Sequence, residues 1–111
     1  MSVQENKDII RRFYEKLNSG DPIAAVDMYL AEEFVGHNAW ENREGFKKVV
    51  TALKAAYPDT QNCIEDIIAE DNNVAVRLTI NGRQKSISAI VVYRIENGKI
   101  VEQWAHSDSF F

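Results

Sequence analysis

The fold is organised around the last predicted strand, which reads Gly98-Lys99-Ile100-Val101-Glu102-Gln103-Trp104-Ala105-His106-Ser107-Asp108. Side chains alternate between the two faces of a strand, so counting from Ile100 places Glu102, Trp104, His106 and Asp108 on one face. Two carboxylates, an imidazole and an indole on one face are typical of a pocket wall. We therefore expect this face to line the functional site.

Three turn signals divide the second half of the chain into four strands. They are Asp71-Asn72-Asn73, Asn81-Gly82 and Asn97-Gly98. Asn-Gly pairs favour two-residue hairpin turns, because both central residues of such a turn need a positive φ. The pattern predicts an antiparallel meander.

A two-residue turn at Asn97-Gly98 also fixes the register of the last hairpin. It predicts five cross-strand pairs on one face, namely Ile95 with Ile100, Tyr93 with Glu102, Val91 with Trp104, Ala89 with His106 and Ile87 with Asp108. Alternation through the other two turns adds Val74, Val76, Leu78, Cys63, Glu65, Ile67 and Ala69 to this face. Because the face holds most of the large apolar residues, we expect helices to cover it. A single β-bulge would reverse the alternation beyond it.

Three helices are predicted before these strands. Apolar residues spaced by four from Ile9 to Leu17 indicate a helix over residues 4–19. Asp21 and Pro22 are the N-cap and first-turn pair of a short second helix. Asn42 caps a third helix, whose apolar stripe comprises Phe46, Val49, Val50, Leu53 and Tyr57. Residues 34–40 indicate a short strand that runs into a loop, so the fold class is α+β, with a curved antiparallel sheet wrapped on three N-terminal helices.

Length, composition and charge exclude several classes of protein. The 111 residues, of which 45% are hydrophobic and 27% charged, suit one domain over residues 1–111. A net charge of -4 without a basic run argues against nucleic acid as a partner. The polar N-terminus and the lack of a long apolar run predict neither a signal peptide nor a membrane partner. The single cysteine, Cys63, excludes an internal disulfide, so we expect a cytoplasmic protein.

The opposite face of the predicted sheet has an apolar centre and a polar rim. Its centre comprises Ile68, Ile90, Val92 and Val101, and its rim comprises Arg77, Arg94 and Gln103. This arrangement is typical of a subunit interface, although a tolerated apolar surface is the alternative. We expect a homodimer formed through the outer sheet face.

Several stretches along almost the whole chain carry a family resemblance. They include Arg12-Phe13-Tyr14-Glu15, His37-Asn38, Arg43-Glu44-Gly45-Phe46, Ala56-Tyr57-Pro58-Asp59 and Tyr93-Arg94-Ile95-Glu96-Asn97-Gly98. In this order and spacing they resemble the SnoaL-like polyketide cyclase family of the nuclear transport factor 2-like superfamily. The resemblance implies a cone-shaped α+β barrel of the ketosteroid-isomerase type, with a pocket between sheet and helices.

The resemblance makes Asp108 the first catalytic candidate, because it lies four residues after Trp104, where the family places a carboxylate that transfers protons. Desolvation at the end of an apolar strand would raise the pKa of this carboxyl group, which suits a general acid or base. His106 is close enough to be oriented by Asp108 and to act as a base. His37 matches the His-Asn pair of the family and is the third candidate. The alternatives are a solvated Asp108 and two histidines with structural hydrogen bonds.

The expected ligand-binding residues are mostly aromatic. Trp40 and Trp104 are expected to be pocket walls that suit a flat apolar ligand. The Tyr14 hydroxyl either stabilises an oxyanion or is a satisfied core group. Tyr93 and Val91 complete the expected set, and Glu102 is expected to hydrogen-bond Tyr93. We expect no metal, because the two histidines lack a ligand spacing, and we interpret Cys63 as a small buried hydrophobe.

The leading hypothesis is proton transfer without a cofactor at a carbon next to a carbonyl. The reaction would be an isomerisation or an aldol-type cyclisation of a small apolar or aromatic oxygenated molecule. Val91, Gln103 and Ala105 stand where the family often has acidic residues or histidine, which favours the alternative of a non-catalytic small-molecule-binding domain. A dimeric scaffold, natural or engineered, is the third hypothesis.

Overall fold

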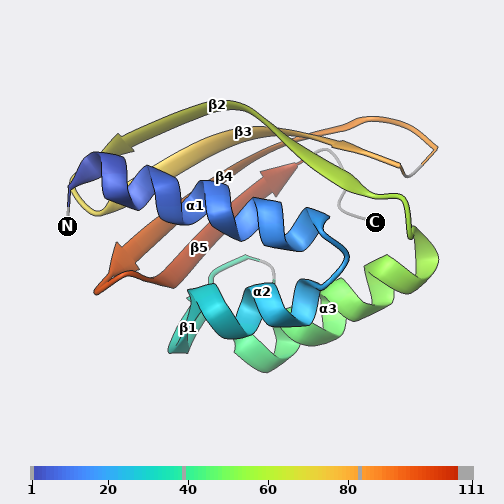
Figure 1. Ribbon diagram of the computed structural model, residues 1–111, viewed down its shortest axis with the longest axis horizontal. Helices are drawn as coiled ribbons and strands as arrows, with labels where there is room; N and C mark the ends of the chain where they lie inside the picture. The colour runs from blue at the N-terminus through green and yellow to red at the C-terminus, as the bar shows by residue number, and fades with distance from the viewer. Residues whose placement is uncertain (1, 39, 83, 108–111) are drawn as a thin grey trace.

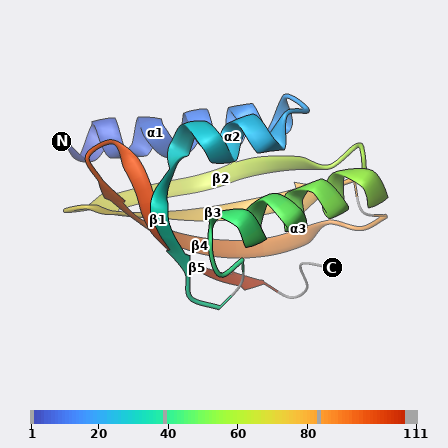
Figure 2. The same ribbon diagram turned by 90° about the horizontal axis from the view of Figure 1, so that it is seen from below.

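The computed structural model describes residues 2–38, 40–82 and 84–107. The elements in these ranges are α1 (Val3–Asn18), α2 (Pro22–Tyr29), β1 (Leu30–Gly36), α3 (Arg43–Ala56), β2 (Gln61–Glu70), β3 (Asn73–Asn81), β4 (Ile87–Glu96) and β5 (Lys99–Ser107). The strands form one sheet in the order β1-β5-β4-β3-β2. Figures 1 and 2 show the described helices on one side of this curved sheet. The α+β fold with a curved sheet wrapped on helices is confirmed.

Short polar side chains determine where each helix begins. Ser2 and Glu5 form a capping box at the start of α1. Asp21 accepts a hydrogen bond from the Ala24 N–H at the start of α2, and Asn42 caps α3 in the same way. The predicted caps Asp21 and Asn42 are therefore confirmed. No helix in the described part of the chain is both long enough and apolar enough to span a membrane.

The four strands β2 to β5 form the predicted antiparallel meander, and β1 joins it in parallel beside β5. The β3 and β4 residues predicted to face inward are all buried. These are Val74, Val76, Leu78, Ile87, Ala89, Val91, Tyr93 and Ile95. They form the core together with α1 residues such as Ile10 and Phe13.

The two Asn-Gly turns have different outcomes. Asn97 and Gly98 both have positive φ, at 51° and 77°, so the tight turn between β4 and β5 is confirmed. The two-residue turn predicted at Asn81-Gly82 is wrong, because Ile80 pairs with Ile87 and the connection is longer. Gly82 instead lies against the main chain of Asp59, where a Cβ atom would come within 2.5 Å of the Asp59 carbonyl oxygen.

A β-bulge in β5 reverses the predicted alternation of that strand. Ile100 pairs with Ile95 and Glu102 pairs with Arg94, so Val101 is an additional residue between the two pairs. Two neighbouring buried residues, Ile100 and Val101, mark the same position in the burial pattern. Beyond the bulge, the inward residues are those predicted to face outward.

Several predicted placements on β5 are therefore wrong. Tyr93 pairs with Gln103, Val91 with Ala105 and Ala89 with Ser107, so the predicted partners Glu102, Trp104 and His106 lie on the outer face instead. The residues Val101 and Gln103, which were assigned to the outer face, are buried, and so is Ala105. Asp108 and its predicted pairing with Ile87 lie outside the described residues.

A second bulge in β2 changes the position of the cysteine. Ile64 pairs with Leu78 and Asp66 pairs with Arg77, which leaves Glu65 as the additional residue. Ile67 and Ala69 pack against the core as predicted. Before the bulge Ile64 packs against the core, and Cys63 is exposed. The prediction of a buried Cys63 is wrong for this reason.

Candidate functional site

A cavity lies between α1, α3 and the inner face of the sheet. Its volume is about 120 Å³. This is close to the size of an engineered apolar cavity, about 150 Å³, that binds benzene in another protein. The cavity therefore suits a single small ring, with the remainder of a larger ligand extending through the opening.

Apolar side chains from three directions form most of the cavity wall. The helix α1 contributes Phe13 and Leu17, α3 contributes Phe46, Val50 and Leu53, and the sheet contributes Leu78, Ile80 and Val91. The spacing of the α3 residues places them on one helix face, which is the stripe that the sequence predicts. Of that stripe only Phe46 is fully buried. Val50, Leu53 and Tyr57 border the open cavity, whereas Val49 does not line it.

Trp40 closes the cavity at the loop between β1 and α3. Its ring lies edge-on to that of Phe46, with 5.0 Å between the ring centroids. Trp40 lines the cavity, as do Tyr14, Tyr93 and Val91. Four of the five residues predicted to bind a ligand therefore surround one cavity. The fifth, Trp104, lies on the outer face of the sheet.

Tyr14 and Tyr93 supply the polar groups of the inner wall. Tyr14 comes from α1 and Tyr93 from β4, and their hydroxyl groups form a hydrogen bond in the core. Both rings pack edge-on against Phe13, which holds them in place. One hydroxyl donates to the other, so the accepting hydroxyl keeps its own proton for a third group.

Burial keeps both tyrosines protonated. It raises the pKa of Tyr14, and the hydrogen bond from Tyr93 offsets only part of this effect. Burial also raises the pKa of Tyr93, and the neighbouring Tyr14 raises it further. At neutral pH the pair is therefore a neutral hydrogen-bond donor in an apolar cavity.

The mouth of the cavity lies where α1 and α3 end and β2 begins. The Asn18 side chain donates to the Asn62 carbonyl oxygen and accepts from the Asn62 N–H, both at 2.9 Å, which ties α1 to β2. Lys54 lies beside Gly20, close enough that a Cβ atom there would be 3.3 Å from the ammonium nitrogen. Among the described lining residues, Lys54 carries the only formal charge, and none has a carboxylate or an imidazole.

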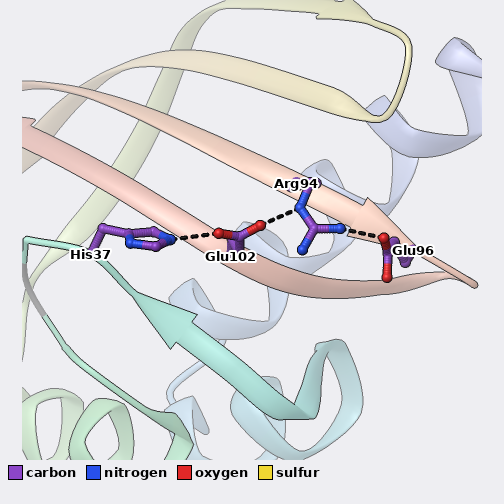
Figure 3. Close-up of polar contacts among 4 residues, drawn as sticks. All are labelled: His37, Arg94, Glu96 and Glu102. Atoms are coloured by element: carbon purple, nitrogen blue, oxygen red, sulfur yellow. Dashed lines mark hydrogen bonds and ion pairs between the residues drawn. The ribbon is translucent and has the colours of Figure 1, made fainter.

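The structure places His37, one of the predicted catalytic residues, on the outer face of the sheet. Its Nε2 atom lies 2.5 Å from a Glu102 carboxylate oxygen. Glu102 also accepts from Arg94, which in turn pairs with Glu96 (Figure 3). The His37 ring is stacked on Trp104, with the centroids 4.6 Å apart. The predicted hydrogen bond between Glu102 and Tyr93 is thus replaced by this network.

Electrostatics within the network favour an ionised Glu102. The hydrogen bond to His37 lowers the pKa of Glu102, and the hydrogen bond to Arg94 lowers it further. The same Glu102 carboxylate raises the pKa of Arg94. Both shifts favour the charged forms of Glu102 and Arg94, and neither residue lines the cavity.

His106 is exposed on the outer face and does not line the cavity. Nearby, the Asn38 side chain donates to the Ala105 carbonyl oxygen at 2.5 Å and accepts from the Ala105 N–H at 2.8 Å. This contact fixes the loop after β1 against β5. His37 and His106 therefore do not converge with the cavity residues, and Asp108 lies outside the described residues.

Sequence reasoning missed two groups of residues near the cavity. The polar mouth of the cavity consists of Asn18, Lys54 and Asn62. Lys54 lies four residues after Val50 and therefore on the same face of α3, so the helical spacing could have predicted it. Gln103 is buried behind the cavity beside Tyr93, and only the bulge at Val101 places it there. Among the described residues no group of three or more histidine, cysteine, aspartate or glutamate side chains is arranged to hold a metal.

Comparison with known proteins places this geometry in a family. No curated protein sequence matches the chain significantly. Wild-type IdmH from Streptomyces antibioticus is 25% identical, with a TM-score of 0.82 over 93% of this chain and 91% of that chain. A loop-truncation variant of IdmH is 27% identical, with a TM-score of 0.83 over 93% of this chain and 92% of that chain.

A third solved structure, TsrD from Streptomyces laurentii, shares the fold at 20% identity, with a TM-score of 0.83 over 97% of this chain and 91% of that chain. The family model described as SnoaL-like polyketide cyclase matches residues 8–110, which is nearly the whole chain. The chain belongs to the SnoaL-like polyketide cyclase family.

Proposed function

We propose that this protein binds a small apolar molecule that contains a ring and a carbonyl group. Without a cofactor, the protein promotes isomerisation or aldol-type cyclisation of this molecule. The observation that carries the proposal is the Tyr14–Tyr93 pair, a neutral hydrogen-bond donor in the wall of an otherwise apolar cavity. Family membership supports the reaction class.

The tyrosine pair suits a ligand carbonyl for an electrostatic reason. The free hydroxyl proton donates to the carbonyl oxygen, and this hydrogen bond strengthens as negative charge develops on that oxygen. Because the tyrosines are already fixed by Phe13, no reorganisation is needed when the charge appears. The C–H bond next to the carbonyl becomes more acidic, which favours both isomerisation and aldol-type ring closure.

The shape of the cavity contributes to the same reaction. The walls from α1, α3 and the sheet hold the ring of the ligand in one orientation beside the tyrosine pair, which lowers the entropic cost of the reaction. Removal of the proton requires a base, and Asp108 remains the residue that we propose for this step on sequence grounds.

A second candidate function is ligand binding without catalysis. The observation in its favour is that Val91 and Ala105 are paired, buried and apolar. These are positions where the family resemblance implies acidic residues. In this alternative the tyrosine pair selects a carbonyl-bearing ligand and no bond is changed.

The binding part of the proposal is tested with two probes of equal shape. Acetophenone carries a carbonyl oxygen, and α-methylstyrene has a CH2 group in its place. We expect the protein to bind acetophenone more tightly. Because either hydroxyl alone can still donate to the carbonyl, we expect the double substitution Tyr14→Phe with Tyr93→Phe to weaken that preference by about three- to tenfold, the effect of one hydrogen bond. Affinities are measured by NMR titration of backbone amide resonances.

Tyr29→Phe is the matched control, because Tyr29 packs against Phe13 and does not line the cavity. We expect this variant to keep the preference for acetophenone. Equal affinity of the unmodified protein for both probes would contradict the proposed carbonyl site.

Catalysis is tested with the same molecule. Exchange of the acetophenone methyl protons in deuterated water reports proton transfer at the carbon next to the carbonyl. We expect the protein to accelerate this exchange and Asp108→Asn to abolish the acceleration. Tight binding without exchange would instead establish the non-catalytic alternative.

A further inference from the structure

Gln103 is a buried polar residue that the mechanism above does not use. Its side chain is 1% exposed, and neither the amide oxygen nor the amide nitrogen has a hydrogen-bond partner among the described residues. Buried amide groups are nearly always paired, because each unpaired group costs free energy on folding. The residue therefore needs an explanation other than fold stability.

The register places Gln103 next to the cavity. It pairs directly with Tyr93 across β4 and β5, and both side chains point to the inner side of the sheet. Side chains of directly paired residues stand about 5 Å apart at their Cβ atoms. On its other side, Gln103 is paired with Gly36 of β1, which has no side chain. Gln103 is not itself a lining residue, so rotation of its side chain is required to reach the wall.

The amide group of Gln103 adds a chemistry that the tyrosine pair lacks. Its oxygen is a strong acceptor, and its nitrogen donates two hydrogen bonds. The tyrosine pair provides one free donor, which a ligand carbonyl uses. A hydroxyl group on the ligand is a natural partner for the amide, because it donates to the oxygen and accepts from the nitrogen.

We propose that Gln103 is a ligand-binding residue that selects molecules with a hydroxyl group in addition to the carbonyl group. This inference rests on the proposed carbonyl site and specifies its substrate class as small apolar hydroxy-carbonyl compounds. The free energy that the unpaired amide costs in the protein alone is recovered when the ligand hydroxyl pairs with it.

The test compares Gln103→Leu with the unmodified protein. Leucine has a similar volume and no polar side-chain atom. The substitution therefore changes the preference for a hydroxylated ligand only if the Gln103 amide contacts that ligand. We expect Gln103→Leu to raise the thermal midpoint by roughly 5 °C. We also expect it to lose the preference for 2-hydroxyacetophenone over acetophenone, a change of about three- to tenfold in Kd.

Asn6→Leu is the matched control. Asn6 is also 1% exposed, and its amide oxygen has no hydrogen-bond partner in the described part of the chain. It precedes Phe13 by two helical turns and does not line the cavity. We expect this variant to keep the preference for the hydroxylated probe. In the unmodified protein, the side-chain amide resonances of Gln103 should shift on addition of 2-hydroxyacetophenone, which tests the contact without a substitution.

The outcomes separate this inference from the proposed function. If Gln103→Leu keeps the preference for 2-hydroxyacetophenone, or the Gln103 resonances do not move, the role of Gln103 is overturned while the carbonyl site stands. If the unmodified protein does not distinguish acetophenone from α-methylstyrene, the carbonyl site fails, and the inference about Gln103 fails with it.

Discussion

Glu102 shows how one residue changes its role when a strand shifts by one position. Alternation from Ile100 assigns Glu102 to the pocket, but beyond the bulge it lies outside with His37 and Arg94. Nothing in the identity of Glu102 distinguishes these positions, because a carboxylate suits either a site or a charged surface. Because the network in Figure 3 lies on the outer face of the sheet, we expect it to contribute to the stability of the protein.

The lowered pKa of Glu102 predicts a contribution to stability that depends on pH. A carboxylate whose pKa is lower in the folded state stabilises the protein above its ordinary pKa of 4.5. That contribution is lost as the pH falls through the folded-state pKa. Glu102→Gln should therefore be less stable than the unmodified protein at pH 5, and the difference should shrink towards pH 3.

Urea unfolding at several pH values measures this difference. Because Glu102 and Arg94 are partly exposed, we expect it to stay below about 1 kcal/mol, as for other surface ion pairs. Glu32→Gln serves as the control, because Glu32 is exposed and forms no ion pair with the described residues. A difference for Glu102→Gln that is constant from pH 5 to pH 3 would show that the network does not favour ionised Glu102.

At the scale of elements, the helices and the central strands are predictable from the sequence because local chemistry determines them. Asp21, Asn42 and the Asn97-Gly98 turn each act on their own neighbours, and the structure confirms all three. The alternation in β3 and β4 is also correct, since it runs without interruption between large apolar residues.

The bulges were not predictable by alternation, and they decide most of the candidate site. In β5, the apolar pair Ile100-Val101 is the only local signal, and two successive apolar residues also occur in regular strands. The parallel partner β1, with Leu30 beside Ile100 and Gly36 beside Gln103, is remote in sequence. The tyrosines on α1 and β4 were therefore found as cavity residues, while Gln103 was assigned to the wrong face.

Gly82 gives a prediction for the β3–β4 connection. Its φ of 95° is unfavourable for other residues, and a Cβ atom would lie 2.5 Å from the carbonyl oxygen and 2.8 Å from the carbonyl carbon of Asp59. Gly82→Ala therefore forces the connection away from the segment after α3. We expect a loss of about 3 kcal/mol in the free energy of unfolding, from strain and overpacking together.

Gly98→Ala separates the two contributions, because Gly98 also has a positive φ, at 77°, in the turn between β4 and β5. We expect this variant to lose only about 1 to 2 kcal/mol, which is the conformational cost alone. Both free energies come from urea unfolding. Equal losses in the two variants would mean that the close approach of Gly82 to Asp59 does not add to the cost.

At the scale of the whole molecule, the sheet has two faces of different character. The inner face is covered by helices, whereas none of the described helices covers the outer face (Figure 2). The outer face exposes Ile68 at 68% and Ile90 at 53%, with the half-buried Trp104 on the same side. The bulge removes Val101 from this face and adds Trp104, so its apolar character is retained.

We propose that a second copy of the chain covers this outer face. Its centre is apolar, and its rim carries both signs of charge, in the pairs Arg77–Asp66 and Arg94–Glu102. A patch with both signs of charge can face itself across a two-fold axis, because each basic group meets an acidic group of the other copy. In light scattering after size exclusion, we therefore expect twice the chain mass of 12.7 kDa.

A charge in the centre of this face should separate the two copies. Ile90→Asp would place an unpaired carboxylate in a desolvated interface, so we expect the mass of a single chain at concentrations where the unmodified protein is a dimer. Met28→Asp is the matched control, because Met28 on α2 is 50% exposed, close to the 53% of Ile90, but lies on a helix. The dimer should persist in that variant. If Ile90→Asp retains twice the chain mass, or Met28→Asp also dissociates, the outer face of the sheet is not the interface.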